Sequence, residues 1–426
     1  MASYGIMAFP LAFAGLAFYI NAPDLYASSF GVPLAEIGLG LLLLRSFDAV
    51  IDPLIGILSD RYSAKRKTIV IGAALLLLVG FWLVFHPQKD IAQSWFLMSA
   101  SICTLGFSIL SINLLSFGGL WVLDENQRTA ASGWREGFGL IGLLTATVAP
   151  SLLGANENPL LAFHRYTLVF VPLLCVCLAL FYRWLGKAHL KEQSSEAETV
   201  REVVGRFRIL VSSRWNLRFF SIFFLSSLAS SIPAVLVVFF VRDYLDLESY
   251  LGIFLLIYFA SGAVSMPFWY WLSKNIGKAP AWILSMVVAS ACFVWAYYLG
   301  IGDAWAFGAI CAGSGFALGA DLTLPPSMIA DRIAQTQGQR NAASYYSLQA
   351  FASKAALALA SGLALPGLAA FGYQPGTPVD DTGKMALPLF YAALPSAIKI
   401  LVAIGALVSF SKINEIGTLK IQKDEA

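Results

Sequence analysis

The stretch "RSFDAVIDPLIGILSDRYSAKRK", from Arg45 to Lys67, places three charged side chains in a segment that is otherwise apolar enough to cross a membrane. Arg45, Asp48 and Asp52 are spaced i, i+3 and i+7, so on a helix they share one face. One arginine cannot neutralise two carboxylates, and each ionisable side chain at bilayer depth costs at least about 2.5–3.5 kcal/mol. We expect these residues either to bind a small cation, Na⁺ or H⁺, or to form a buried ion pair that locks the fold.

The composition of the chain is that of an integral membrane protein. Its 426 residues are 58% hydrophobic and only 12% charged, whereas soluble domains average about 25% charged. Apolar runs of the roughly 20 residues that span a bilayer recur along the whole length, and the spacing excludes the short alternating strands of a β-barrel. The sequence predicts an all-α integral membrane fold with twelve transmembrane helices, at about 4–29, 34–58, 68–86, 93–121, 127–153, 164–186, 216–242, 249–273, 279–300, 304–330, 341–371 and 386–410.

Lysine and arginine residues are distributed unevenly between the connections. The connections after odd-numbered runs contain only Lys89, Arg165, Arg242 and Lys384. Because cytoplasmic loops are enriched in Lys and Arg, we expect both termini to be cytoplasmic in a multi-pass protein of the cell (inner) membrane. The connections after even-numbered runs and the C-terminal tail contain most of them, namely Arg61, Lys65, Arg66, Lys67, Arg128, Lys274, Lys278, Arg332, Arg340, Lys412 and the cluster from Arg183 to Arg218.

The longest polar segment, from Gly186 to Trp215, divides the chain almost in the middle. We therefore predict an N-terminal six-helix bundle over 1–186, a cytoplasmic linker over 187–215, a C-terminal six-helix bundle over 216–411 and a cytoplasmic tail over 412–426. Two parallel six-helix repeats are typical of secondary transporters.

The second and eighth runs are similar enough to compare as repeats. Aligning 45–65 with 259–278 superposes Pro53 on Pro267, whereas the three charged positions of the first copy are occupied in the second by Phe259, Gly262 and Met266. The scaffold therefore does not require these charges, which favours a function confined to the N-terminal half.

These residues also form a family pattern. The motif Arg45-x-x-Asp48-Ala-x-x-Asp52-Pro53-x-x-Gly56 resembles the second helix of the glycoside-pentoside-hexuronide:cation symporters, the melibiose permease-like branch of the major facilitator superfamily. The likeness extends over essentially the whole chain, through the segments 3–5, 123–142, 327–331 and 345–363. The resemblance implies a major facilitator fold and cation-coupled transport of a small solute.

The resemblance also implies roles for single residues. Asp48 and Asp52 match the carboxylates that bind the coupling cation, and Ser108 stands where the family often has a threonine oxygen ligand. Arg135 matches a cavity arginine, and Lys354 matches a lysine near the cation site. Further candidates for substrate binding or coupling are Arg45, Gln349, Ser111 and Asp321, and Asp60 with Arg61 resembles the cytoplasmic turn in which charge pairs stabilise one state of the transport cycle.

The sugar-binding acids of the resembled family are missing. Leu11 and Ala12 replace a lysine and an aspartate on the first helix, and Ser111 replaces a second acid. Keeping Arg135 and Lys354 without these acids would make the cavity more positive, so we expect an anionic or amphiphilic substrate rather than a neutral galactoside. For Asp321, which precedes a Pro325-Pro326 pair expected to bend or break its helix, a gating or substrate role and a position near the cytoplasmic mouth remain alternatives.

The functional prediction is a cation-coupled transporter that imports a small organic solute by alternating access. A proton-coupled exporter or antiporter and an uncoupled facilitator of the same fold are the alternatives. An enzyme is not expected, because the sequence contains no Ser/His/Asp, phosphate-loop or metal-ligand constellation. We expect no cofactor beyond the coupling ion, no nucleic acid partner, a small-molecule substrate, the lipid bilayer as surroundings, and a monomer.

Overall fold

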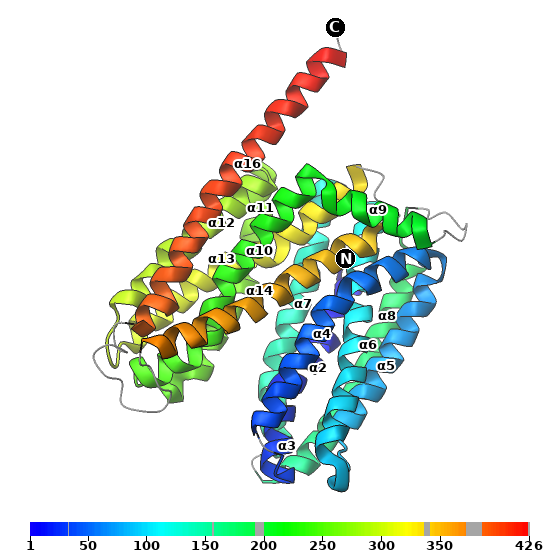
Figure 1. The fold of residues 1–426 in the computed structure, drawn as a ribbon. Helices are drawn as coiled ribbons and strands as arrows, with labels where there is room; N and C mark the ends of the chain where they lie inside the picture. Colours follow the sequence, from blue (N-terminus) through cyan, green and yellow to red (C-terminus); the bar gives the residue numbers. More distant parts are fainter. Residues whose placement is uncertain (33, 156, 192–199, 336–340, 372–385, 425–426) are drawn as a thin grey trace. The chain divides into compact units, whose positions relative to one another are not determined.

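A computed structural model describes residues 1–426 except 33, 156, 192–199, 336–340, 372–385 and 425–426 (Figure 1). Within the described residues every regular element is a helix, and the β pairing consists of one isolated bridge between Trp121 and Leu190. The predicted all-α class is therefore confirmed.

The helices of the N-terminal half follow the predicted apolar runs closely. The first run contains two short helices and a π-helical segment before its last helix, an irregularity that its uniformly apolar sequence does not reveal. The elements are α1 (Ala2–Gly5), α2 (Ala8–Leu16), the π segment Ala17–Asn21, α3 (Ala22–Phe30), α4 (Leu34–Arg61), α5 (Arg66–Val84), α6 (Ala92–Leu120), α7 (Glu125–Leu152) and α8 (Pro159–Leu185).

The helices of the C-terminal half begin with one in the predicted linker. They are α9 (Val200–Ser212), α10 (Arg214–Phe239), α11 (Leu251–Ile276), α12 (Lys278–Phe293), α13 (Ala304–Gln335), α14 (Ala342–Ala370) and α16 (Leu394–Asp424). The sequence predicted a bend or a break at Pro325 and Pro326, and the break is wrong, since α13 runs through both prolines. Membrane helices tolerate proline because neighbouring groups satisfy the freed carbonyls.

Side-chain caps fix where two of the long helices begin. Asp124 precedes α7, and its Oδ1 accepts a hydrogen bond from the backbone nitrogen of Gln127 at 2.7 Å, while Gln127 Oε1 accepts one from the Asp124 nitrogen at 3.2 Å. Asn158 caps α8 by accepting from the Leu161 nitrogen at 3.1 Å. Each cap satisfies backbone donors that the first helical turn leaves without partners.

Among the described residues, nine helices are long and apolar enough to cross a membrane. The helix α4 is not one of them, because Arg45, Asp48 and Asp52 all fall in its middle. The charges that point to a function are thus the same ones that make α4 a poor membrane segment by composition.

Contacts between residues group the chain into two compact units. The first unit is Met1–Leu210 with Ile329–Phe351, and the second is Val211–Met328 with Ala352–Ala426. The end of α13 and the start of α14 therefore pack with the N-terminal half. The predicted domain boundaries stay a prediction. The two units are defined by contacts between residues and do not distinguish the helix bundles from the linker or the tail.

Aromatic stacking and close helix approach build the core of the first unit. The rings of Phe13 and Tyr166 lie 4.3 Å apart, and the Tyr166 hydroxyl donates to the Phe13 carbonyl at 2.8 Å. The helices α5 and α6 approach so closely that a Cβ added at Gly80 would lie 2.4 Å from the Cys103 nitrogen. Small residues permit such approach between membrane helices.

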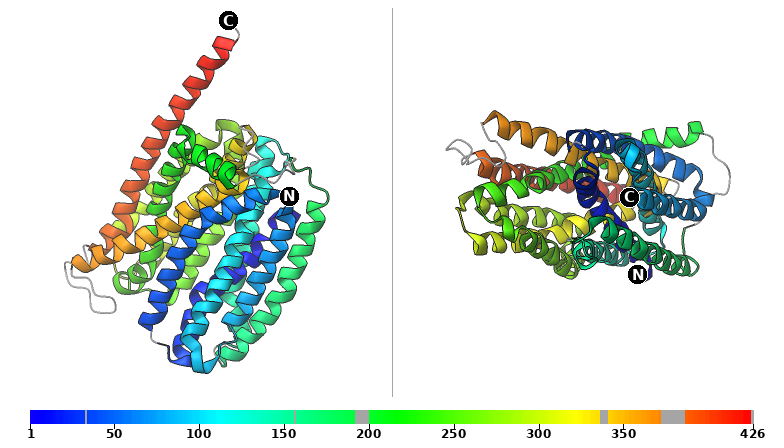
Figure 2. Two further views of the ribbon diagram at one scale, coloured as in Figure 1. Left: turned by 45° about the vertical axis from the view of Figure 1, so that its right-hand side comes forward. Right: turned by 90° about the horizontal axis from the view of Figure 1, so that it is seen from below.

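In the second unit, α10, α12 and α16 lie side by side, as the two views in Figure 2 show. The Phe240 and Tyr391 rings stack 4.0 Å apart, and Phe254 meets Phe307 edge-on at 4.8 Å.

Candidate functional site

The centre of the candidate site is the contact between α4 and α6. Asp48 on α4 is only 5% exposed and Ser108 on α6 only 1%. The Ser108 hydroxyl donates a hydrogen bond to Asp48 Oδ1 at 2.7 Å. The structure therefore brings together two of the residues that the sequence proposed for one cation site.

Asp52 lies one helical turn further along α4 and is fully buried. Its neighbours Ile51 and Ile55 belong to an apolar cluster with Ile112 of α6 and Ala343 of α14. The side chain of Arg45 lies outside the described part of the structure. Apolar surroundings strengthen every electrostatic interaction at this turn of α4.

The oxygen atoms gathered here suit a hard monovalent cation or a proton. Carboxylate oxygens are acceptors only, and hard cations prefer oxygen ligands, while two neighbouring carboxylates can also share a proton. Ser111, one turn from Ser108, is half-buried and donates to the Ser108 carbonyl at 3.1 Å. The described residues contain no group of three or more His, Cys, Asp or Glu side chains that could hold a metal ion.

A second polar cluster lies at the end of α4, and we call it the Asp60 cluster: Asp60, Arg66, Ala343 and Ser344. The buried Asp60 carboxylate accepts from Arg66 Nη2 at 2.8 Å. It also accepts from the backbone nitrogens of Ala343 at 2.9 Å and Ser344 at 2.8 Å and from the Ser344 hydroxyl at 2.6 Å. Asp60 thus caps the start of α14, where the helix dipole favours a negative charge.

Other contacts join the end of α13 and the start of α14 to the rest of the first unit. Arg128, at the start of α7, forms an ion pair with Asp331 of α13 at 2.9 Å. A Cβ at Gly56 would lie 2.2 Å from the Ser347 hydroxyl, so only glycine allows α4 to approach α14 this closely. This explains the glycine of the α4 motif.

Arg61, proposed together with Asp60, lies outside the Asp60 cluster. Its guanidinium carbon is 5.3 Å from the centre of the Tyr62 ring, and the buried partner of Asp60 is Arg66. The sequence marked Arg66 only as one of several basic residues of a cytoplasmic turn, because nothing in that run distinguishes it from Lys65 or Lys67.

Arg135 is buried on α7, with 6% of its surface exposed. It forms an ion pair with its neighbour Glu136, and Nε lies 2.9 Å from Glu136 Oε1. Sequence reasoning missed this partner because adjacent side chains on a helix normally point apart. The positive charge assigned to Arg135 is therefore balanced within its own helix.

Gln349 and Lys354 both lie on α14, five residues apart. Gln349 belongs to the first unit, and its buried amide oxygen has no hydrogen-bond partner among the described residues. Lys354 belongs to the second unit and is half-buried. The grouping into units thus divides α14 between these two candidates.

In the second unit, Asp321 forms a cluster with residues of three other helices. Its carboxylate accepts from Lys399 Nζ at 2.5 Å and from Trp282 Nε1 at 2.8 Å. Lys399 also donates to the Ser230 hydroxyl at 2.7 Å. Lys399 is the single lysine of the last apolar run, and the sequence analysis did not predict it as a site residue.

Comparison with known proteins places the chain in a transporter family. A family model described as MFS/sugar transport protein matches residues 1–415. The inner membrane symporter YicJ of Escherichia coli (strain K12) is 26% identical over 147 residues, 32% of each chain, so this match spans about a third of YicJ. The uncharacterized symporter YjmB of Bacillus subtilis (strain 168) is 24% identical over 392 residues, covering 87% of this chain and 84% of that one.

Solved structures show the same fold at low identity. A bacterial homologue of the iron transporter ferroportin in an outward-facing state superposes with a TM-score of 0.73 at 14% identity, over 96% of this chain and 100% of that chain. The fucose:proton symporter of E. coli gives a TM-score of 0.64 at 14% identity, over 95% and 98% of the two chains.

These relatives are transporters rather than enzymes. A membrane transporter family is consistent with the long apolar helices of this chain. The protein is therefore a multi-pass inner membrane protein with the helical fold of the major facilitator superfamily. Since the family model covers nearly the whole sequence and both relatives are named symporters, the chain belongs to the MFS/sugar transport protein family, in its melibiose permease-like branch of symporters.

Proposed function

We propose that the protein imports a small organic solute by cation-coupled symport, with Na⁺ or H⁺ as the coupling ion and no other cofactor. The observation that carries this proposal is the burial of Asp48 and Asp52 one turn apart on α4, with the Ser108 hydroxyl on Asp48. The symporter names of both relatives support it.

The energetics of the carboxylate pair favour a cation. Side chains four residues apart on a helix lie about 6 Å from one another, and two negative charges at that distance repel by roughly 3 kcal/mol at an effective dielectric constant of about 20. A monovalent cation or a proton at Asp48 and Asp52 would convert this repulsion into attraction. We assign the cation ligands to Asp48, Asp52 and Ser108.

Alternating access would use α4 as the link between this site and a gate. Asp48, Asp52, Gly56 and Asp60 follow at four-residue intervals, so each lies about one turn from the next along α4. Twelve residues of helix span about 18 Å, so a displacement of α4 on cation binding would act on the Asp60 cluster. We propose Asp60, with Arg61 beside it, as gating residues, and Arg66 as the ionic partner of Asp60.

We further propose twelve membrane spans in two six-helix halves, with both termini in the cytoplasm. The unequal distribution of Lys and Arg between alternate connections supports this topology. A monomer is the proposed working unit, because each chain of this fold would contain one central substrate site.

For the substrate we propose an anionic or amphiphilic compound. The support comes from Lys354 and from the apolar residues Leu11 and Ala12, which occupy positions where the sugar transporters of this branch carry charges. Arg135 contributes less than the sequence suggested, because Glu136 balances its charge. Gln349, Ser111, Asp321 and the undescribed side chain of Arg45 remain proposed contributors to substrate binding or coupling.

A stability assay on the purified full chain tests the cation site without knowledge of the substrate. Thermal unfolding is measured while NaCl replaces choline chloride at constant ionic strength, and separately as pH is varied. A ligand at one hundred times its dissociation constant adds about 2.7 kcal/mol of stability. We expect Na⁺, or protons if H⁺ is the coupling ion, to stabilise the wild type and not the Asp48→Asn or Asp52→Asn variants.

The exposed Asp90 provides a matched control, because Asp90→Asn removes one negative charge outside the site. An unchanged Na⁺ and pH response in the Asp48→Asn/Asp52→Asn double variant would refute the cation assignment. The same assay with organic acids and sugars then tests the substrate class. Since ion and substrate binding are linked reciprocally, a symport substrate should bind more tightly when the coupling ion is present.

A further inference from the structure

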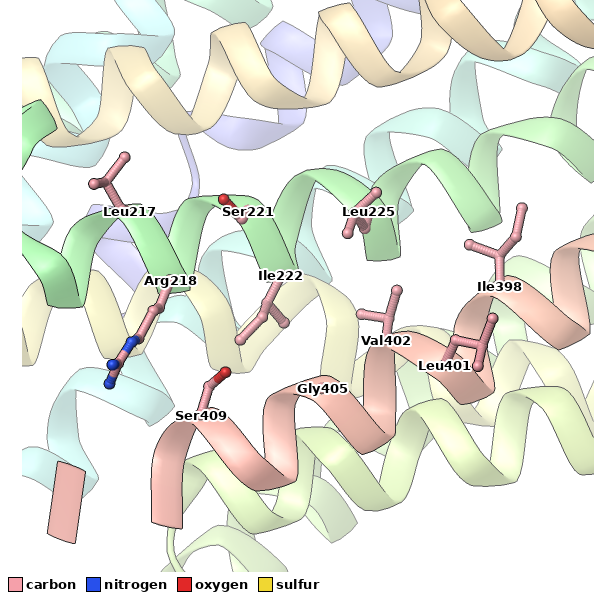
Figure 3. A pocket seen from close by; sticks show the side chains of 10 residues that line it. All are labelled: Leu217, Arg218, Ser221, Ile222, Leu225, Ile398, Leu401, Val402, Gly405 and Ser409. Atoms are coloured by element: carbon pink, nitrogen blue, oxygen red, sulfur yellow. The ribbon is translucent and has the colours of Figure 1, made fainter. Parts of the chain in front are cut away.

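A surface groove of about 500 Å³ runs between α10 and α16 in the second unit (Figure 3). Both helices are long and apolar enough to cross a membrane. Leu217 is 53% exposed, Leu225 42% and Leu401 68%. The walls are largely aliphatic and consist of Leu217, Ile222, Leu225, Ile398, Leu401 and Val402.

The groove is open at Gly405 of α16. A Cβ added to Gly405 would meet no atom within 4 Å. The missing side chain therefore leaves room at this position for an apolar group from outside the chain.

The two ends of the groove differ in polarity. Arg218 and Ser409 lie at one end, whereas Leu225 and Ile398 lie at the other (Figure 3). Arg214 is exposed one turn before Arg218, so both guanidinium groups are on the same side of α10. Neither arginine has an acidic partner among the residues that the structure describes.

We propose that this groove binds an anionic phospholipid of the surrounding bilayer. One acyl chain would lie along the aliphatic walls, the phosphate would pair with Arg218, and the Ser409 hydroxyl could donate a hydrogen bond to it. The span from Ile398 to Ser409 is eleven residues of helix, about 16 Å. This is roughly half of the 30 Å hydrocarbon core, which is the length available to an acyl chain in one leaflet.

The alternatives fit the groove less well. A second copy of the chain would need a stable interface of about 1,000 Å² or more, and ten residues of two helices provide too little surface. A zwitterionic lipid would fill the walls equally well, but it would not use the positive charge at the end of the groove. The proposal does not depend on which cation or solute the protein transports.

The test compares phosphatidylglycerol with phosphatidylcholine on the full chain purified in detergent. Equal mole fractions of the two lipids are added, and the lipid retained on each protein molecule is counted by native mass spectrometry. One arginine near a membrane surface contributes about a fivefold preference for an anionic headgroup. We expect the wild type to retain phosphatidylglycerol about fivefold better, and the Arg218→Gln variant to lose that preference.

A matched pair of glycine variants tests the groove itself. Gly405→Leu would occupy the groove and should lower retention of both lipids several-fold. Gly362→Leu, on α14, is the control, because a Cβ there also meets no atom within 4 Å. Arg218→Gln is a surface change that keeps the test valid if Gly405→Leu does not fold.

Three results would overturn the proposal. The first is equal retention of the two lipids by the wild type, and the second is equal retention by the two glycine variants. The third is a dimer that becomes a monomer on Gly405→Leu substitution, measured by light scattering, since a second copy would then be the occupant.

Discussion

The Asp60→Asn substitution should release the start of α14 from the end of α4. The buried carboxylate of Asp60 accepts four hydrogen bonds between 2.6 and 2.9 Å, from Arg66, Ala343 and Ser344. An asparagine would remove the charge and turn an amide donor toward these donors. Removing one partner of a buried ion pair costs about 3–5 kcal/mol, so the contact would weaken roughly a hundredfold to several thousandfold.

Cysteine labelling in detergent measures this release. Ser347, fully buried beside α4, is replaced by cysteine as a reporter, in a background where the exposed Cys175 is changed to serine. We expect Asp60→Asn to raise the maleimide labelling rate at least tenfold, and Asp90→Asn to leave it unchanged. An equal labelling rate with and without Asp60→Asn would refute this account. It would also be refuted if the Asp60→Asn and Arg66→Gln effects on the labelling rate were fully additive in the double variant, because partners in one ion pair should not act independently.

Three further predictions concern binding and packing. Ser108→Ala removes a proposed oxygen ligand, worth about 1.5–3 kcal/mol as a contact to a charged group, so the half-stabilising Na⁺ concentration should rise at least tenfold in a thermal unfolding titration. If H⁺ is the coupling ion, the half-stabilising proton concentration should fall instead, because the lost hydrogen bond favoured the ionised Asp48 carboxylate. Lys399→Met should lower the unfolding free energy by about 3–5 kcal/mol in denaturant titrations, and adding Asp321→Leu should recover most of it, because the pair is then replaced by apolar groups. Gly80→Ala should lower the melting temperature, since its Cβ would lie 2.4 Å from backbone, whereas Gly72→Ala, with no atom within 4 Å, should leave it unchanged or slightly higher.

The relative placement of candidate residues could be predicted where both lie on one helix. Asp48 and Asp52 share a face of α4 because their spacing matches the helical period, and periodicity can be read directly from residues. Every apolar run predicted from the sequence also overlaps a helix, because run length and composition determine helix position in a membrane.

Partners that are distant in the chain could not be predicted. Asp60 accepts from the backbone nitrogens of Ala343 and Ser344, 283 and 284 residues away, and backbone donors carry no side-chain signature. The lysine that pairs with Asp321 is 78 residues further along the chain. Such pairs depend on which helices become neighbours, and a single sequence does not contain that information.

The sizes of these energies explain why ion and solute would have to act together. The helices α4 and α14 meet at the Asp60 cluster and where Gly56 packs against Ser347. The proposed cation ligands lie further along α4, and Lys354 lies further along α14. Binding events at separate sites typically couple by about 1–3 kcal/mol each, whereas loss of the Asp60 contact costs about 3–5 kcal/mol. Under the proposed function, one ligand would at most equal the lower end of this cost, whereas cation and substrate together would contribute about 2–6 kcal/mol, a range that covers the whole of it.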